Sequence, residues 1–136
     1  MRKEVEIVIA IGTNTNQEIS MFLAKQLLEQ LLKGIKFTEE LWTLPVDIKS
    51  DRFLNCLAIG HTTHGAPQIK NALRRIENRC GDSKTARANG SVKMDIDILL
   101  YDGQRMHEKD WERPYIQTLM KEVETIRNNE TSNTKE

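Results

Sequence analysis

Two aspartates separated by one residue lie in the apolar run VKMDIDILLYDG, residues 92–103. Its alternation predicts a β-strand with Asp95, Asp97, Leu99 and Tyr101 on one face and Met94, Ile96, Ile98 and Leu100 on the other. The aspartate Cα atoms would then be about 6–7 Å apart, so the carboxyl groups can converge where repulsion favours a cation or a shared proton. Carboxylates of this kind bind Mg²⁺ together with water and substrate phosphates. The spacing alone is a weak signal, since a solvated acidic strand end has the same pattern.

A basic stretch directly precedes the two aspartates. Residues 74–93 contain six cationic side chains against the two acids Glu77 and Asp82, a local excess of four (six minus two). The cations are Arg74, Arg75, Arg79, Lys84, Arg87 and Lys93. Beside a carboxylate pair, this charge suits a phosphate-bearing ligand and its Mg²⁺. For any single cation, a solvated helix face or loop is an equally good interpretation.

An aromatic residue and an amide, Phe53 and Asn55, are two residues apart in the apolar run RFLNCLAIG, residues 52–60. In a strand they project to the same side. A ring for stacking beside an amide that donates and accepts hydrogen bonds can hold a flat heterocycle. Taken alone, the pair is better explained as a core phenylalanine and an asparagine at a strand end. The turn GTNTN, residues 12–16, lacks the spacing of a P-loop.

The elements that must position these residues alternate along the chain. We expect strands at residues 5–11, 35–43 and 52–60 and in the run with the aspartates. A first helix would begin with a capping box of Thr15 and Glu18 and end near Gly34. Its expected buried face is Ile19, Phe22, Leu23, Gln26, Leu27, Gln30 and Leu31. A second helix at residues 67–80 would bury Ile69, Leu73, Ile76 and Cys80.

This β-α-β-β-α-β order predicts an α+β, ferredoxin-like fold. In that fold, two helices cover one face of an antiparallel sheet, and we expect the other face to be free for binding. The chain has 136 residues, so we predict a single domain at residues 1–127, followed by a disordered polar tail at 128–136.

Composition narrows the class of protein. No stretch is apolar enough to cross a membrane and the N-terminus lacks a signal-peptide layout, so a cytoplasmic location is expected. Cys56 and Cys80 are too few and too far apart for a disulfide framework or a zinc knuckle. The net charge of zero gives no general argument for nucleic-acid binding.

Four segments together resemble hydroxymethyldihydropterin pyrophosphokinase, an enzyme family of the folate pathway. They are IAIGTN (9–14), RFLNCLAI (52–59), RRIE (74–77) and MDIDILLYDG (94–103), in the family's order and at nearly its spacing. The resemblance covers roughly residues 5 to 115. It implies a ferredoxin-like fold and transfer of pyrophosphate from Mg·ATP to the hydroxymethyl group of a reduced pterin, which leaves AMP. It also implies that Asp95 and Asp97 hold two Mg²⁺ ions that bridge the ATP phosphates.

The resemblance assigns further roles. Phe53 would stack on the pterin and Asn55 would hydrogen-bond its edge, with backbone groups near Thr43 and Val46 closing the pocket. Lys84 and Arg87 would act beside the aspartates as catalytic cations, and in-line attack on the β-phosphorus would need no strong general base. The expected ATP-binding residues are Arg74, Glu77, Lys93, Ile98 and Tyr115.

The chain departs from the family pattern in three places. An arginine-rich lid with a tryptophan is replaced by CGDSKTARANGSVK, residues 80–93, where Asp82 stands for a cation and Asn89 for the aromatic. The family's V-P-H becomes Arg113-Pro114-Tyr115, without the histidine beside the nucleotide. Further on, Lys121 and Val123 are the nearest positions to an arginine and a second stacking aromatic.

Three functional interpretations stay open at this point. The first is an active pyrophosphokinase with a reduced lid, acting on small molecules and contacting neither nucleic acid nor membrane. The second is a divergent relative that binds Mg·ATP or a pterin and turns over slowly or not at all. A ferredoxin-like RNA-binding module comes third, because the expected sheet lacks the aromatic pattern of such modules. The sequence does not predict an oligomeric state.

Overall fold

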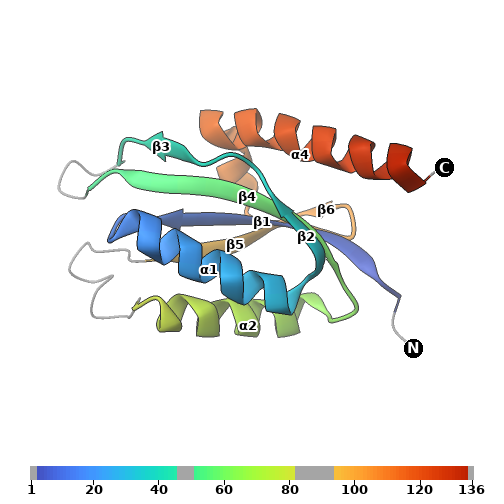
Figure 1. The fold of residues 1–136 in the computed structure, drawn as a ribbon, viewed down its shortest axis with the longest axis horizontal. Coiled ribbons are helices and arrows are strands. Elements are labelled where there is room, and N and C mark those ends of the chain that lie inside the picture. Colours follow the sequence, from blue (N-terminus) through green and yellow to red (C-terminus); the bar gives the residue numbers. More distant parts are fainter. Residues whose placement is uncertain (1–2, 46–50, 82–93, 135–136) are drawn as a thin grey trace.

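A six-stranded sheet forms the centre of the computed structural model, which describes residues 3–45, 51–81 and 94–134. Its strands pair antiparallel in the order β2-β4-β1-β5-β6, and β3 also pairs with β4 (Figure 1). This order confirms the α+β, ferredoxin-like prediction. The strands are β1 (Val5–Thr13), β2 (Lys33–Phe37), β3 (Leu41–Thr43), β4 (Phe53–Thr62), β5 (Asp95–Tyr101) and β6 (Gln104–Arg105).

Helices cover both faces of this sheet. On one face lie α1 (Gln17–Leu31) and α2 (Ala66–Arg79), and on the other lies α4 (Pro114–Thr134), preceded by the short 3₁₀ helix η1 (Glu108–Glu112) (Figure 1). The prediction of a free second face is therefore wrong where α4 lies. The central strands carry apolar side chains on both sides, and α4 buries the second set. This α4 cluster consists of Val8, Leu57, Ile59, Leu99, Ile116, Leu119 and Val123.

The last helix is longer than the sequence suggested. Residues 128–134, predicted as part of a disordered tail, continue α4 as far as Thr134. Arg127 attaches the helix to β1 through a bidentate contact with Glu6, with Nη2 2.6 Å from Oε1. One turn later, the Glu130 carboxylate lies 3.6 Å from Lys36 Nζ on β2. In the part of the chain described, no helix combines the length and hydropathy that crossing a membrane requires.

The buried face of α1 differs from the predicted one. Met21, Ala24 and Leu28 are fully buried, whereas Ile19 and Phe22 are 75% and 64% exposed. Both sets have helical spacing, and the smaller Ala24 lets the helix approach the sheet closely. The predicted capping box is also wrong, because the helix begins at Gln17 after Asn16, whose side chain makes no capping hydrogen bond. In α2 the predicted face is confirmed by buried Ile69, Leu73 and Ile76, while Cys80 is half-buried at the C-cap.

The predicted strand at 35–43 is divided into β2 and β3 by a β-bulge. Phe37 pairs with Ala58 and Leu41 pairs with Asn55, so three residues of one strand face two of the other. Thr38 compensates for the interruption, because its hydroxyl accepts the buried N–H of Leu57 at 2.9 Å.

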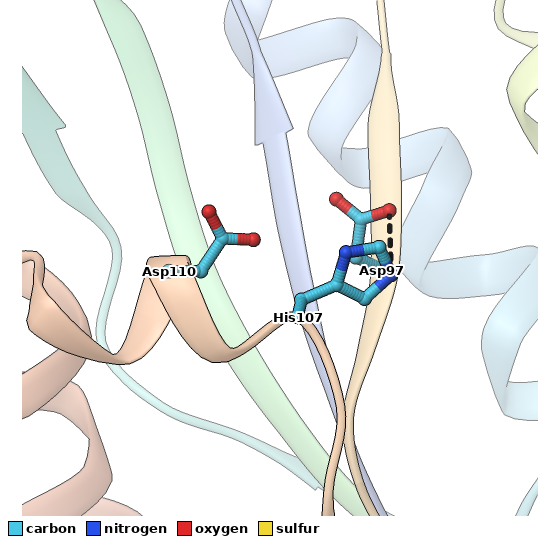
Figure 2. A group of neighbouring side chains, drawn as sticks. All are labelled: Asp97, His107 and Asp110. Carbon is cyan, nitrogen blue, oxygen red and sulfur yellow. Dashed lines mark ion pairs between the residues drawn. The ribbon is translucent and has the colours of Figure 1, made fainter.

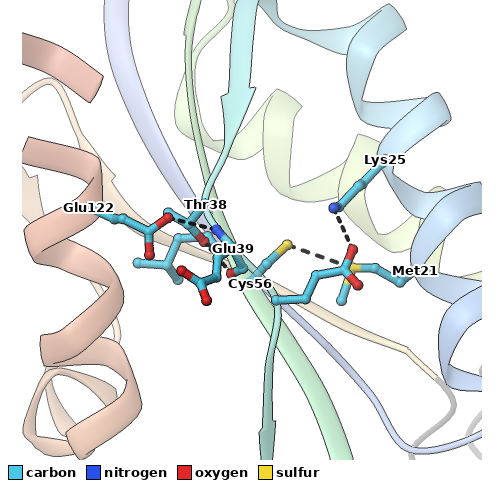
Figure 3. A network of polar contacts seen from close by, with 8 residues as sticks. Met21, Lys25, Thr38, Glu39, Cys56 and Glu122 are labelled. Atoms are coloured by element: carbon cyan, nitrogen blue, oxygen red, sulfur yellow. Dashed lines mark hydrogen bonds and ion pairs between the residues drawn. The ribbon is translucent and has the colours of Figure 1, made fainter. Parts of the chain in front are cut away.

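A polar network around this bulge connects α4 with α1 (Figure 3). On the α4 side, Glu122 Oε1 accepts the N–H of Glu39 at 2.8 Å. On the α1 side, Lys25 pairs with Glu40, and Cys56 Sγ lies 3.7 Å from Met21 Sδ. Burial raises the pKa of Cys56 to about 12, so its thiol stays neutral. The network holds the residues just before β3, the strand whose Leu41 and Thr43 accept hydrogen bonds from Asn55.

A second irregularity in β5 changes the predicted alternation. Ile98 and Leu100 pair with consecutive residues of β1, so Leu99 is the extra residue of a bulge. After this bulge, successive side chains of β5 point to the opposite faces of the sheet from those predicted. Leu100 packs with the α4 cluster, and Tyr101 packs with the core under α1 and α2, opposite to the prediction. The aspartates precede the bulge and keep their common face.

Candidate active site

Gly12 of β1 lies between the two halves of the predicted site. It pairs with Asn55 of β4 on one side and with Asp95 of β5 on the other. These positions share the α4 side of the sheet, because Ala10, two residues before Gly12, packs against the α4 cluster. Neighbouring strands are about 4.8 Å apart, so the Cα atoms of Asn55 and Asp95 are separated by roughly 10 Å, with no side chain from β1 between them. Three strands thus bring the amide and the carboxylates onto one surface.

Glycine suits this central position because a side chain would be crowded there. A Cβ atom at Gly12 would lie 3.0 Å from Asn55 Oδ1 and 3.7 Å from Phe53 Cδ1. A larger residue would displace the amide, whereas glycine leaves room for a close approach to the backbone. The glycine of the IAIGTN segment therefore forms the floor between the two halves.

Asn55 is held in one orientation by β3. It is only 4% exposed, and its Nδ2 donates hydrogen bonds to Thr43 Oγ1 at 2.8 Å and to Leu41 O at 3.3 Å. Thr43, expected to contribute backbone groups, thus uses its hydroxyl to orient the amide. The Asn55 Oδ1 atom faces the Gly12 side, and the half-buried Phe53 lies two residues away on the same face. Val46, predicted beside them, lies outside the described residues.

The two aspartates share a face, as the alternation predicted. The pKa of Asp97 is raised to about 8, mainly by burial, then by the charge and hydrogen bond of Asp95 and, to a smaller extent, by the charges of Glu77 and Asp110. The Asp97 side chain is 26% exposed, so water screens this repulsion only in part. At pH 7 such a carboxyl group keeps a proton unless a cation takes its place. The electrostatics of the pair therefore fit a cation-binding site.

Glu77 and Ile98 lie at the outer edge of β5. The Glu77 carboxylate, from α2, accepts the N–H of Ile96 at 2.8 Å. By strand alternation, the main-chain groups of Ile98 point to the same edge. The Ile98 side chain is buried in the core, so only its main chain is available to a ligand at this edge. Arg74 is exposed on α2.

Tyr115, in the first turn of α4, is close enough to the aspartates for their charges to affect its pKa. Burial raises the pKa of its hydroxyl; Arg113 lowers it, and Asp110, Asp95 and Asp97 raise it again. Val123, on the side of α4 that packs against the sheet, is fully buried and cannot stack on a ligand. Lys121 is exposed. The other predicted cations, Lys84, Arg87 and Lys93, lie outside the described ranges.

Two residues at the aspartates were missed by the sequence analysis. His107 Nε2 lies 3.7 Å from Asp97 Oδ1, and Asp110 completes a group whose ligand atoms are all within 4.8 Å of one another (Figure 2). The available signal was the H-x-x-D spacing shortly after a D-G turn. That turn folds the chain back along β5 and so returns His107 to the face with Asp97.

Comparisons with known proteins agree with this arrangement. A family model for 7,8-dihydro-6-hydroxymethylpterin-pyrophosphokinase matches residues 8–125, a range that contains Gly12, Asn55 and both aspartates. The chain is 32% identical over 125 residues to the folate synthesis bifunctional protein of Arabidopsis thaliana, covering 82% of this chain and 25% of that protein. It thus spans about a quarter of the length of this curated relative. The chain belongs to the 7,8-dihydro-6-hydroxymethylpterin-pyrophosphokinase family.

Proposed function

We propose that this chain transfers pyrophosphate from ATP to the hydroxymethyl group of 6-hydroxymethyl-7,8-dihydropterin, a step of folate biosynthesis. The observation that carries the proposal is the row of Asn55, Gly12 and Asp95 across β4, β1 and β5. A heterocycle held at Asn55 would extend over the glycine, and its hydroxymethyl group would point toward the aspartates. Membership of the family supports this chemistry.

The pterin half depends on a preorganised amide and a ring. Because the Asn55 Nδ2 group is engaged by Thr43 and Leu41, its Oδ1 is the atom that would accept an N–H of the pterin. Phe53 would stack on the ring, a contact worth about 1–3 kcal/mol by analogy with base stacking. Since β3 fixes the amide before the ligand arrives, little conformational entropy is lost on binding.

The donor set at β5 fits Mg²⁺. Asp95 and Asp97 offer carboxylate oxygens on one face, and the burial and acidic neighbours that raise the pKa of Asp97 are conditions that a bound cation would offset. We propose that these two residues hold two Mg²⁺ ions, which when bound would neutralise charge on the ATP phosphates. Asp97 would give up its proton on binding, and Asp95 would keep it oriented through their contact.

The nucleotide half would lie along the outer edge of β5. Main-chain groups of Ile98 would face the base, with Glu77 and Arg74 of α2 on the same side and Tyr115 at the start of α4. Lys84, Arg87 and Lys93 would supply cations for the phosphates. Catalysis would come from positioning and electrostatics, since in-line attack by the pterin hydroxyl needs no strong base. A cytoplasmic location and exclusively small-molecule partners stay predictions.

Direct product analysis tests the proposal. Purified protein is incubated with Mg·ATP and 6-hydroxymethyl-7,8-dihydropterin, and nucleotides are separated by chromatography while phosphorus NMR follows the transferred group. We expect AMP and the pterin pyrophosphate in equal amounts, with loss of both in Asp95→Ala. Ile19→Ser, an exposed change on α1, is the matched control. ADP as the product, or AMP formed without pterin, would contradict pyrophosphate transfer.

One observation favours the alternative of a relative that binds but turns over slowly. Val123, nearest to the family's second stacking aromatic, is buried under α4, so the pterin would be stacked on one side only by the described residues. Calorimetry with a non-hydrolysable ATP analogue and the pterin separates the two interpretations. Binding of both ligands without AMP release would favour the alternative, whereas steady AMP release would exclude it.

A further inference from the structure

The β5–β6 hairpin directs the following segment back to the carboxylate pair. Asp102 and Gly103 both have left-handed backbone, with φ of 51° and 81°, as a tight hairpin turn requires. After β6, Met106 N–H donates to Leu99 O at 2.9 Å, so the returning chain stays attached to β5. His107 is also left-handed, with φ of 54°, and turns the chain into η1. This path places the imidazole beside Asp97.

Asp97, His107 and Asp110 have the geometry of a ligand set. Their ligand atoms all lie within 4.8 Å of one another, and His107 Nε2 is 3.7 Å from Asp97 Oδ1. Two ligands on opposite sides of a divalent ion, with bonds of about 2.1 Å, are about 4.2 Å apart. Small side-chain rotations would therefore bring all three atoms onto one ion. Figure 2 shows the imidazole directly beside the Asp97 carboxyl group, with Asp110 on the adjoining turn of η1.

The segment that carries these ligands is held in place. Trp111 Nε1 donates to Met106 O at 3.1 Å, and Asp110 N–H donates to His107 O at 2.9 Å. Arg113 Nε lies 3.3 Å from Asp110 Oδ1. This contact orients the Asp110 carboxylate through one oxygen and leaves the other oxygen able to bind a metal. Carboxylates that bind metals are commonly oriented by such a partner. The set is thus largely preorganised before any ion binds.

The donor types decide which ion the set prefers. Mg²⁺ takes oxygen ligands almost exclusively, whereas imidazole nitrogen suits first-row transition metals. We propose that Asp97, His107 and Asp110 together bind one transition-metal ion, such as Mn²⁺, Co²⁺ or Zn²⁺. The inference rests on the proposed function only through Asp97, which both sites share.

Metal binding can be measured without either substrate. Tag-free protein, stripped with a chelator, is titrated with Co²⁺ and with Mg²⁺, and calorimetry and the visible absorption of Co²⁺ are followed. We expect one Co²⁺ per chain, with affinity reduced about 10-fold or more in His107→Gln and in Asp110→Asn. Mg²⁺ affinity should change less than twofold in His107→Gln. His64→Gln, an exposed histidine in the turn after β4, is the matched control and should behave as wild type.

A spectroscopic measurement identifies the ligand directly. Pulsed EPR of the Mn²⁺-loaded protein should show coupling to an imidazole nitrogen that is lost in His107→Gln and kept in His64→Gln. Equal Co²⁺ binding by wild type and His107→Gln, or no nitrogen coupling in wild type, would overturn the inference. AMP release with Mg²⁺ reports on the proposed function separately. Nitrogen ligation without AMP release would contradict only the function, and AMP release without nitrogen ligation would contradict only the metal assignment.

Discussion

Replacing Asp97 by asparagine should stabilise the metal-free protein, and the gain should grow with pH. The pKa of Asp97 is about 8 in the folded protein against 3.8 for an ordinary aspartate, chiefly because it is buried beside Asp95. The folded state therefore binds more protons than the unfolded state between these values, so wild-type stability falls as the pH rises from about 4 to about 8. Asparagine has no proton to lose, so the variant should escape this decline.

The size of the effect follows from the shift. A displacement of about four pKa units would correspond to roughly 5–6 kcal/mol if it fell on one group. Water reaches part of the Asp97 side chain, which is 26% exposed, and weakens the repulsion from its acidic neighbours, so we expect about 2–4 kcal/mol at pH 8.5. Near pH 4 the variant and the wild type should differ by less than about 1 kcal/mol, because Asp97 is then neutral in the folded state and only about half ionised in the unfolded state.

Urea denaturation followed by tryptophan fluorescence measures this difference at pH 4.5, 6.5 and 8.5 in the presence of a chelator. Asp102→Asn is the control, because it removes an aspartate from an exposed turn where asparagine also tolerates a left-handed backbone. Adding Mg²⁺ with an ATP analogue should then stabilise wild type more than Asp97→Asn, since the ion binds only the folded state. Parallel pH profiles for variant and wild type would refute the reasoning.

Three further predictions concern single positions. Gly12→Ala should weaken pterin binding by about tenfold in calorimetry, because a Cβ atom would lie 3.0 Å from Asn55 Oδ1; unchanged affinity would mean that the amide is not at the ligand. Phe53→Ala should cost about 1–3 kcal/mol in pterin binding and leave binding of an ATP analogue unchanged; equal losses would indicate a core role. Thr38→Val should lower the free energy of unfolding by about 1–3 kcal/mol, because the buried N–H of Leu57 loses its acceptor, while exposed Thr63→Val should have little effect.

Much of the fold could be predicted because its strongest elements have a clear period. The central strands and α2 carry long apolar patterns that only one secondary structure satisfies. The bulge at Thr38 was not predictable. There the Thr38 hydroxyl, and not a main-chain carbonyl, accepts the N–H of Leu57, and this exchange leaves the hydrophobic pattern of the sequence unchanged. In α1 two apolar stripes overlap, and only packing against the sheet selects the one with Met21, Ala24 and Leu28.

The candidate site was predictable where strand alternation determines it. Asp95 with Asp97, and Phe53 with Asn55, each follow from a spacing of two within one strand. The distance between the two pairs could not be predicted, because it depends on the register of β1 against both neighbours. His107 was missed for a different reason, since its place beside Asp97 depends on a hairpin turn and on the path into η1.

Gly12 gives β1 an unusual sensitivity to changes in chain length. The strand contributes no functional side chain to the row of Asn55 and Asp95, yet it sets how the two flanking strands are aligned. Inserting or deleting one residue within β1 would shift one end of the strand by about 3.3 Å and exchange its faces, so a side chain would replace the bare backbone at the centre. Apolar exchanges of similar volume at the core positions of β1 should therefore be tolerated better than any change in the number of residues between Val5 and Gly12, when this domain is designed or recombined.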